Sequence, residues 1–397
     1  MINFQETNAT EFLNHYWQKK PLLIRNALPG FINPLTPEEL AGLSLEDDIE
    51  SRIVIETPGT PSCWALKKGP FTETDYQHLP ETHWTLLVQG LDQLIPEVHA
   101  LLPHFNFIPE WRFDDVMASY ACQHGSVGPH YDNYDVFLYQ AKGRRKWSLT
   151  TKHCHPENYL EGVDLRIMKQ FEIEQEFILE EGDMLYLPPH IGHHGVALSD
   201  DCITYSFGYR SYQDIEMWDS FGEYLFEQAR KKNLYQDPSW SSLKGTSELP
   251  KAATIQAKKL LQNILEDEKT LNAWFACFAT RLDFITEQKL PLPIDEIEHL
   301  SRDDFMAQLK TSTEIVRDPI CRFGYQLKES NQTCDLFING QPWPVEGVSL
   351  ELVMLIANNH NVAAKKLSPY LDDEKNQNFL CELWKLQWIV CHGNHSG

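Results

Sequence analysis

Short apolar runs rich in aromatic and branched residues, typical of β-strands, occupy the first half of the chain from about residue 50 to residue 210. Turn residues separate the apolar runs, for example Ala141-Lys142-Gly143 and Glu180-Glu181-Gly182-Asp183. Many short strands without helices between them predict an antiparallel sandwich or barrel. The runs are SRIVIE, HWTLLVQGL, VMASYACQ, DVFLYQ, RRKWSLT, FEIEQEFILE, DMLYLP, HHGVAL and ITYSFGY.

The apolar period changes to 3.6 after Arg210, which predicts helices. One predicted face carries Ile215, Trp218, Phe221 and Leu225, and a second carries Leu271, Trp274, Phe275, Phe278, Leu282 and Ile285. A further helix is expected at residues 9–20, ending before Pro21. Apolar stripes of this kind along predicted helices are typical of helices that pack on one another within the chain or on a second chain.

The turn-rich stretch 290–295 indicates a domain boundary. Predicted helices and a possible β-hairpin, formed by QLKES and CDLFING, follow it. We therefore expect a mainly β domain over 1–211, a helical domain over 212–290 and a small α+β, winged-helix-like domain over 291–397. The last domain lacks a basic stripe, so DNA binding is not expected.

Composition places the chain among soluble globular proteins, with 397 residues, 42% hydrophobic and 23% charged. It shows no signal peptide and no apolar run near the roughly 18 residues that span a membrane, so we expect a cytoplasmic protein without membrane contact. Nine cysteines without a C-x-x-C pair indicate free thiols. The net charge of −23 argues against direct nucleic-acid binding. Its acidic excess, concentrated before residue 210, serves solubility or attracts a basic substrate.

A candidate metal site lies in the strand-rich half, where seven of the sixteen histidines fall between His124 and His194. His130 and Asp132 stand two residues apart, so an extended backbone directs both to one face. His193 follows the hairpin-like GDMLYLPPHIG and completes two histidines and one carboxylate, the ligand set of non-haem Fe(II) oxygenases. An ordinary hairpin with a hydrogen-bonded histidine is the alternative, and His194 is the rival third ligand.

Such iron sites commonly take 2-oxoglutarate, whose far carboxylate needs a fixed cation. Arg145 shares a strand face with Trp147, opposite Arg144 and Lys146, so it points inward if Trp147 does. A guanidinium grips a carboxylate with two parallel hydrogen bonds. An outward-facing basic strand is the alternative. The groups His153-Cys154-His155 and Cys391, His392 and His395 lie in polar or terminal segments and are discounted as metal sites.

The motifs PHYDNYDVF, GRRKW, EEGDMLYLPP, YSFGYR and FLNHYWQKKPLLIR resemble those of the bacterial JmjC/cupin ribosomal oxygenases. The resemblance spans nearly the whole chain. It implies a double-stranded β-helix (cupin, JmjC) barrel, a helical dimerisation region and a winged-helix-like domain. It further implies a homodimeric dioxygenase that uses Fe(II), 2-oxoglutarate and O2 to hydroxylate an arginine side chain of large-subunit ribosomal protein L-sixteen.

Residue by residue, the resemblance implies three groups of site residues. The iron ligands, which are also the catalytic group, would be His130, Asp132 and His193, and the 2-oxoglutarate contacts would be Arg145 and Ser119. The substrate contacts would be Asp115, Met117, Tyr134 and Ser206, although Met117 also suits a core and Asp115 a turn. Unlike the family pattern, His190 and His194 flank the third ligand. Two alternatives stay open: a JmjC hydroxylase or demethylase of another protein target, and a catalytically idle JmjC-like interaction module.

Overall fold

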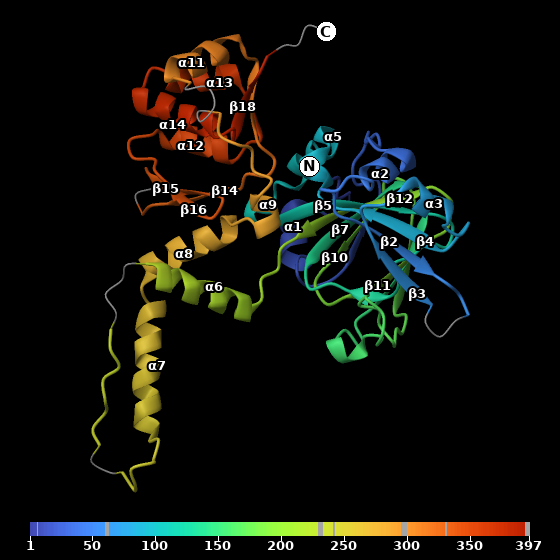
Figure 1. Ribbon diagram of the computed structural model, residues 1–397, viewed down its shortest axis with the longest axis horizontal. Coiled ribbons are helices and arrows are strands. Elements are labelled where there is room, and N and C mark those ends of the chain that lie inside the picture. The colour runs from blue at the N-terminus through green and yellow to red at the C-terminus, as the bar shows by residue number, and fades with distance from the viewer. Residues whose placement is uncertain are drawn as a thin grey trace. The chain divides into compact units, whose positions relative to one another are not determined.

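The structure is a computed structural model that describes residues 1–5, 7–59, 63–228, 233–240, 243–294, 300–329 and 332–393. The chain divides into two compact units, Met1–Ser211 and Tyr212–Gly397 (Figure 1). The finer division into three domains, with a boundary near residue 290, stays a prediction.

The first unit is built on a large antiparallel sheet of eight strands within the described residues. Their order across the sheet is β1-β10-β7-β12-β5-β4-β2-β3, so the chain crosses repeatedly between distant strands. The strands are β1 (Leu22–Ile24), β2 (Ser51–Glu56), β3 (Trp64–Lys68), β4 (Trp84–Val88), β5 (Phe113–Ala121), β7 (Asp135–Lys142), β10 (Met184–Leu187) and β12 (Cys202–Tyr209).

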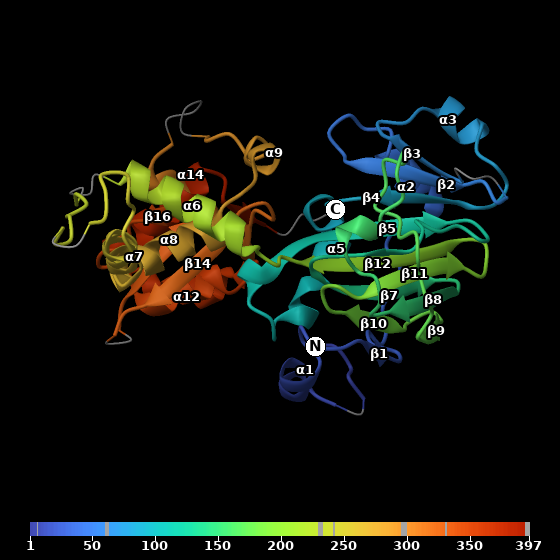
Figure 2. The same ribbon diagram turned by 90° about the horizontal axis from the view of Figure 1, so that it is seen from below.

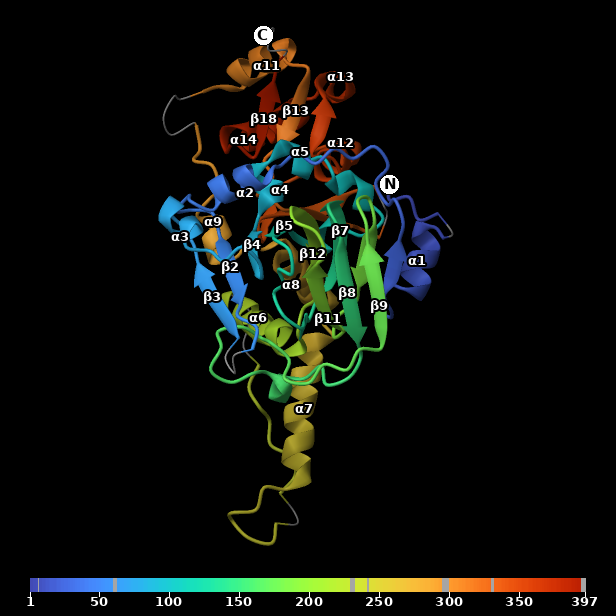
Figure 3. The ribbon, with the colours of Figure 1, turned by 90° about the vertical axis from the view of Figure 1, so that its right-hand side faces the viewer.

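A second, four-stranded antiparallel sheet has the order β6-β11-β8-β9 and consists of β6 (His130–Tyr131), β8 (Arg145–Thr150), β9 (Gln175–Leu179) and β11 (Gly192–Ala197). Figures 2 and 3 show these strands and those of the large sheet from two further directions. Apolar side chains from both sheets form one buried cluster, among them Leu138 and Leu185 of the large sheet and Trp147 and Leu149 of the small one. The two sheets therefore pack face to face, as the predicted sandwich or barrel requires.

The period-two pattern places alternate residues of a strand in different cores. In β7, Val136 and Leu138 belong to the cluster between the sheets, whereas Phe137 and Tyr139 belong to the main core on the other face. Short helices cover that outer face and contribute residues such as Phe12. They are α1 (Ala9–His15), α2 (Pro37–Leu43), α4 (Leu91–Leu94), α5 (Pro96–His99) and the 3-10 turn η1 (Leu102–Phe105). Further short elements are α3 (Glu73–Gln77), η2 (Glu110–Arg112) and η3 (Pro156–Asn158).

The first helix is shorter than predicted, because it ends at His15 rather than before Pro21. Gln18 has a φ of +57°, a left-handed conformation that does not continue a helix. Its backbone N–H donates to the Tyr186 hydroxyl at 2.7 Å, and its side chain reaches Asp135 at 3.4 Å. Tertiary hydrogen bonds with the sheet therefore replace the last predicted turn.

The second unit begins with helices α6 (Asp214–Glu227), α7 (Lys251–Leu265), α8 (Glu268–Thr280) and α9 (Phe284–Glu287). Phe221, Trp274 and Phe278 form a buried cluster there, with Leu225 packed against it. The predicted stripes are wrong at their ends. Ile215 and Trp218 are exposed, and α8 stops at Thr280, so Leu282 and Ile285 lie outside it. Helix α7 buries none of its residues and extends away from the rest of its unit (Figure 1).

The remainder of the second unit forms its own core around residues such as Phe305, Leu352 and Trp384. Two three-stranded sheets, β17-β13-β18 and β14-β15-β16, pack with helices, and β14 pairs with β15 in the predicted hairpin. The elements are α11 (Arg302–Thr311), β13 (Glu314–Arg317), β14 (Phe323–Leu327), β15 (Cys334–Ile338), β16 (Gln341–Trp343), α12 (Leu350–Ala357), β17 (Asn361–Ala363), α13 (Ala364–Leu367), η4 (Ser368–Tyr370), α14 (Glu374–Lys385) and β18 (Ile389–His392). All nine cysteines are free thiols. No described helix is long and apolar enough to cross a membrane.

Candidate metal centre

Strand pairing in the small sheet brings the predicted metal ligands together. His193 of β11 lies directly opposite His130 of β6, and Asp132 follows β6. One potential ligand atom from each of the three side chains lies within 4.8 Å of the others. Among the described residues, this trio is the one group of three or more His, Cys, Asp or Glu side chains with that geometry.

The hydrogen bonds around the two histidines leave the same ring nitrogen of each available. His130 Nδ1 lies 2.9 Å from the Gly128 carbonyl oxygen, and His193 Nδ1 lies 2.9 Å from the Ile191 carbonyl oxygen. A carbonyl oxygen only accepts, so both Nδ1 atoms carry the proton and both Nε2 atoms keep a lone pair. Carbonyl partners of this kind orient metal-binding histidines in proteins.

Charge and burial also suit a cation at this point. His193 Nε2 lies 3.6 Å from an Asp132 carboxylate oxygen, and the two imidazole rings have centroids 4.2 Å apart. Burial, reinforced by the neighbouring His130, lowers the pKa of His193 to about 4. The ring is therefore neutral at physiological pH, which is the form that binds a metal. Two imidazole nitrogens and one carboxylate fit Fe(II).

The rival histidines lie elsewhere. His194 is on the opposite face of β11, with its ring centroid 6.1 Å from that of Phe171, as alternation along a strand requires. His190 has a φ of +63° and donates its backbone N–H to the Asp132 carbonyl oxygen at 2.8 Å. The bend at His190 therefore holds the backbone of Asp132, while the His190 side chain stays exposed.

Arg145 is buried inside the barrel, with only 2% of its surface exposed. The strand face is the predicted one, because Trp147 is buried beside it while Arg144 is exposed. The Arg145 Nε atom donates to the Cys202 sulfur at 3.5 Å, and the guanidinium carbon lies 5.7 Å from the Trp147 ring centroid. The buried Nη2 atom has no hydrogen-bond partner. A buried cation with an unsatisfied donor fits an anionic ligand such as a carboxylate.

Three of the four predicted substrate contacts share one face of the large sheet with Ser119. Asp115, Met117 and Ser119 alternate along β5 and therefore face the interior, whereas Val116 and Ala118 face the main core. Ser206 of β12 is paired with Met117. Ser119 is also buried and donates its hydroxyl to the Thr204 carbonyl oxygen at 3.4 Å.

The electrostatics of the half-buried Asp115 are unusual. Burial, with the like charge of Asp114 second, raises its pKa to about 6, although the Gly90 backbone N–H donates to it at 3.4 Å. Tyr134 is 42% exposed, so it is not a core residue. Burial of its hydroxyl end, followed by the charges of Asp132 and Asp115, raises the pKa of Tyr134, although the residue as a whole keeps an exposed surface. Tyr134 is thus electrostatically coupled to both the metal trio and the substrate-side acid.

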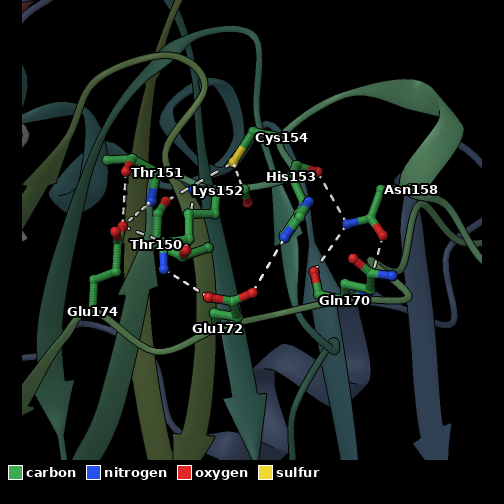
Figure 4. Close-up of polar contacts among 9 residues, drawn as sticks. All are labelled: Thr150, Thr151, Lys152, His153, Cys154, Asn158, Gln170, Glu172 and Glu174. Atoms are coloured by element: carbon green, nitrogen blue, oxygen red, sulfur yellow. Dashed lines mark hydrogen bonds and ion pairs between the residues drawn. The ribbon is translucent and has the colours of Figure 1, made fainter.

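Among their described residues, the discounted histidine groups form no comparable cluster. Figure 4 shows the loop after β8, where the His153 ring points to Glu172, with Nε2 3.4 Å from a carboxylate oxygen. Cys154 lies within 3.5 Å of the Lys152 carbonyl oxygen rather than facing an imidazole. His392 is at the end of β18, and His395 lies outside the described residues.

Three buried residues next to Arg145 and Ser119 were not singled out from the sequence: Gln140, Thr204 and Cys202. Each is at an inward position of a strand otherwise rich in apolar residues. A polar residue at such a position is the signal that would have found them, because burial is costly for a polar group without a partner.

Comparison with known proteins agrees with this architecture. The JmjC domain family matches residues 100–217, and the ROXA-like winged helix family matches residues 259–389. The ribosomal protein uL16 3-hydroxylase of Escherichia coli K12 is 33% identical over 317 residues, which cover 78% of this chain and 80% of that protein. A probable ribosomal oxygenase of Haemophilus influenzae is 42% identical over 201 residues, covering 50% of this chain and 48% of the relative.

A solved structure of YcfD, a ribosomal oxygenase from Escherichia coli, in complex with cobalt and 2-oxoglutarate superimposes with a TM-score of 0.81 at 28% identity. The match covers 99% of both chains.

Proposed function

Because the chain belongs to the family of JmjC-domain ribosomal oxygenases, we propose that it uses Fe(II), 2-oxoglutarate and O2 to hydroxylate an arginine side chain of large-subunit ribosomal protein uL16, the L-sixteen of the sequence analysis. The convergence of His130, Asp132 and His193, with the buried Arg145 further along the same inner strand face beyond Trp147, carries this proposal. The name of the Escherichia coli relative supports the target protein and hydroxylation at a 3-position.

His130, Asp132 and His193 would hold Fe(II) on one side and leave the other coordination positions to the co-substrates. The bound metal, with 2-oxoglutarate and O2, supplies the oxidising chemistry for a C–H bond. The chain fixes the geometry. Two backbone carbonyls set the imidazole rings, and the bend at His190 sets the Asp132 backbone. Such preset ligands avoid reorganisation when the metal binds.

Arg145 would bind the far carboxylate of 2-oxoglutarate. Its unpaired Nη2 atom and its burial support this role, because a carboxylate there would satisfy the donor and the charge together. Ser119 is the second proposed contact. Its single hydroxyl proton is engaged in a long 3.4 Å bond, so turning it to a carboxylate costs little.

Asp115, Met117, Tyr134 and Ser206 would hold the substrate arginine. A guanidinium pairs with a carboxylate and packs its face on an aromatic ring, and Asp115 with Tyr134 offers both. Met117 supplies an adaptable apolar wall and already lies 3.8 Å from an Arg52 guanidinium nitrogen through its sulfur. This clamp orients the reacting carbon and excludes water from it.

The acidic surface supports a basic substrate. Before residue 210 the sequence holds 14 basic and 30 acidic residues, a balance of −16, against −7 for the rest. Attraction between this charge and a basic ribosomal protein raises the association rate at low salt. Added salt should therefore slow capture of the substrate more than it slows the chemical step.

A homodimer is the second part of the proposal. Large apolar side chains are exposed on α6 and α7, including Trp218 at 51% and Phe226 at 83%. Exposed apolar surface of this kind is typical of interfaces. Light scattering on the Trp218→Glu/Phe226→Glu variant tests it. The wild-type protein should have the mass of a dimer and the variant that of a monomer, and a monomeric wild-type protein rejects the dimer.

The activity is tested by incubating the protein with Fe(II), 2-oxoglutarate and a uL16 fragment in air, with His130→Ala as the control. Succinate and a fragment heavier by one oxygen atom on an arginine are expected from the wild type alone. Succinate with hydroxylation of another residue type, or of another protein only, contradicts the arginine target. Failure to bind Fe(II) and to form succinate contradicts the oxygenase and favours the interaction module.

A further inference from the structure

Behind Arg145 lies a chain of buried polar side chains, which we name the polar belt: Ser119, Thr204, Gln140 and Cys202. It crosses β5, β12 and β7 of the large sheet and reaches Arg145 of the small one. The Ser119 hydroxyl donates to the Thr204 carbonyl, and the Thr204 hydroxyl donates to the Gln140 side chain at 3.1 Å. The belt therefore links the two residues proposed to bind 2-oxoglutarate.

Cys202 is the member that touches Arg145. Its sulfur lies 3.5 Å from the Arg144 carbonyl oxygen, which can only accept, so the thiol proton is directed there. The sulfur lone pairs remain for other donors. One of these donors is the Arg145 Nε–H at 3.5 Å. The thiol is thus an acceptor toward the guanidinium.

Gln140 is the second side chain that contacts the thiol. Its amide nitrogen lies 2.7 Å from the Lys142 carbonyl oxygen, 3.2 Å from the Cys202 sulfur and 3.3 Å from the Ile203 carbonyl oxygen, so its two protons serve three acceptors. Its amide oxygen is engaged by Thr204, which decides the orientation of the amide group. Gln140 therefore presents its amide N–H side to the Cys202 sulfur, which accepts from it as well as from Arg145.

Sulfur is a weak acceptor, and this matters for the charge of Arg145. No carboxylate of the described residues forms an ion pair with Arg145, so its positive charge is not neutralised within the protein. An aspartate or glutamate in place of Cys202 would orient the guanidinium but would also compete with an anionic ligand. The thiol orients the Arg145 guanidinium but leaves the positive charge and the Nη2 donor of that group for the ligand.

We propose that Cys202, held by Gln140, is a positioning residue for the dicarboxylate co-substrate: it sets the direction of the Arg145 guanidinium and thereby the affinity for 2-oxoglutarate. The inference rests on the proposed function in one respect, namely that Arg145 binds the far carboxylate.

Equilibrium binding to the cobalt-loaded protein, measured by titration calorimetry, tests it without turnover. Two ligands are compared. One is 2-oxoglutarate, and the other is 2-oxopentanoate, which keeps the metal-chelating end but has a methyl group in place of the far carboxylate. The variants are Cys202→Ala, Cys202→Ser and Arg145→Ala. Cys122→Ala is the matched control, since Cys122 is also a buried thiol of the first unit and contacts Trp84 instead of Arg145.

Cys202→Ala should weaken 2-oxoglutarate binding about three- to ten-fold, as expected for one lost weak hydrogen bond to a charged group. It should leave 2-oxopentanoate binding unchanged. Cys202→Ser, whose hydroxyl also accepts, should restore part of the loss. Cys122→Ala should bind both ligands as the wild type does. In an Arg145→Ala background, Cys202→Ala should cause no further loss, because the thiol acts through the guanidinium.

Equal weakening of both ligands by Cys202→Ala would mean a distorted metal centre and would overturn the positioning role. If Cys202→Ala weakens the binding of neither ligand, the positioning role is also overturned. If Cys202→Ala does not fold, the double variant Cys202→Ser/Gln140→Leu replaces it, and an unchanged affinity for 2-oxoglutarate in that variant overturns the role as well. Failure of the proposed function looks different. Arg145→Ala would then bind 2-oxoglutarate as tightly as the wild type does, and the co-substrate site itself would be misplaced.

Discussion

The affinity of the protein for its substrate should depend on pH through Asp115. Burial raises the pKa of this carboxyl to about 6 in the free protein. An arginine substrate is charged at every accessible pH and pairs only with the ionised carboxylate. Binding below this pKa must therefore release a proton, so the affinity should rise with pH and level off above about pH 7.

The size of the effect follows from the titration curve. With a pKa of about 6, roughly one-tenth of the Asp115 carboxyls are ionised at pH 5 and nearly all at pH 7.5. The dissociation constant for a substrate fragment should thus fall about tenfold over that interval. Asp115→Asn removes the ionisable group. It should bind weakly and with no change over the same interval.

The assay is calorimetric binding of a uL16 fragment to the cobalt- and 2-oxoglutarate-loaded protein from pH 5 to pH 7.5. Asp114→Asn is the control, because the charge of Asp114 is the second cause of the raised pKa. In this variant the midpoint of the curve of affinity against pH should move to lower pH, while the affinity reached at high pH should stay the same. An Asp115→Asn variant with the wild-type slope would refute this reasoning, since another group would then carry the titration.

Three further predictions concern stability and packing. Burial raises the pKa of Asp92 to about 7, so the folded state favours the protonated carboxyl and wild-type stability falls as the pH rises from about 4 to about 7. The Asp92→Asn variant, which still accepts from the Val116 N–H, should be more stable than the wild type by up to about 4 kcal/mol at pH 8 and equal to it near pH 4. Urea titrations at both pH values measure this, and a pH-independent difference would contradict it. Phe12 is fully buried among aromatic rings, so Phe12→Ala should lower the free energy of unfolding by about 3–5 kcal/mol. A loss below about 1 kcal/mol would contradict its place in the core. Gly195→Ala would put a methyl group 2.6 Å from the Trp147 ring and should destabilise the first unit by about 1–3 kcal/mol, whereas an unchanged urea midpoint would show that the ring gives way freely.

Short runs of aromatic and branched residues predict most strands of the first unit, because central strands such as β7 pack one face between the sheets and the other on the main core. Strand β3 was missed. Its sequence WALKK has three apolar residues followed by two lysines, and three of its five side chains are exposed, since β3 is an edge strand of the large sheet. An edge strand with one paired side has little apolar signal to read.

The helix ends were the weakest part of the sequence prediction, for reasons outside the local sequence. Gln18 leaves the first helix to bond with Asp135 and Tyr186, which lie more than a hundred residues away along the chain. Arg281 ends α8 with an extended backbone, although the apolar period continues to Leu282 and Ile285. Periodicity records what each side chain prefers, whereas these ends are decided by tertiary contacts.

The candidate site was predictable where its residue types are distinctive. His130, Asp132 and His193 carry unusual chemistry at a recognisable spacing, and the structure brings them together. Their roles as ligands, like those of Arg145 and the substrate contacts, stay predictions. The polar belt was not predicted because Gln140 and Cys202 are ordinary strand residues until the sheet order places them behind Arg145. Arg145 and Cys202 are 57 residues apart in the sequence and lie in different sheets, so no local motif contains their contact.

The source of the transferred oxygen tests the central claim most directly. The Fe(II)-loaded protein would be mixed anaerobically with 2-oxoglutarate and a uL16 fragment, exposed to isotopically heavy O2, and the fragment sequenced by mass spectrometry, with His130→Ala in parallel. The account predicts one heavy oxygen atom on one arginine, with succinate formed in equal amount, and neither product from the variant. An unlabelled arginine beside a turnover-competent wild-type protein, or labelling that survives in His130→Ala, would contradict it.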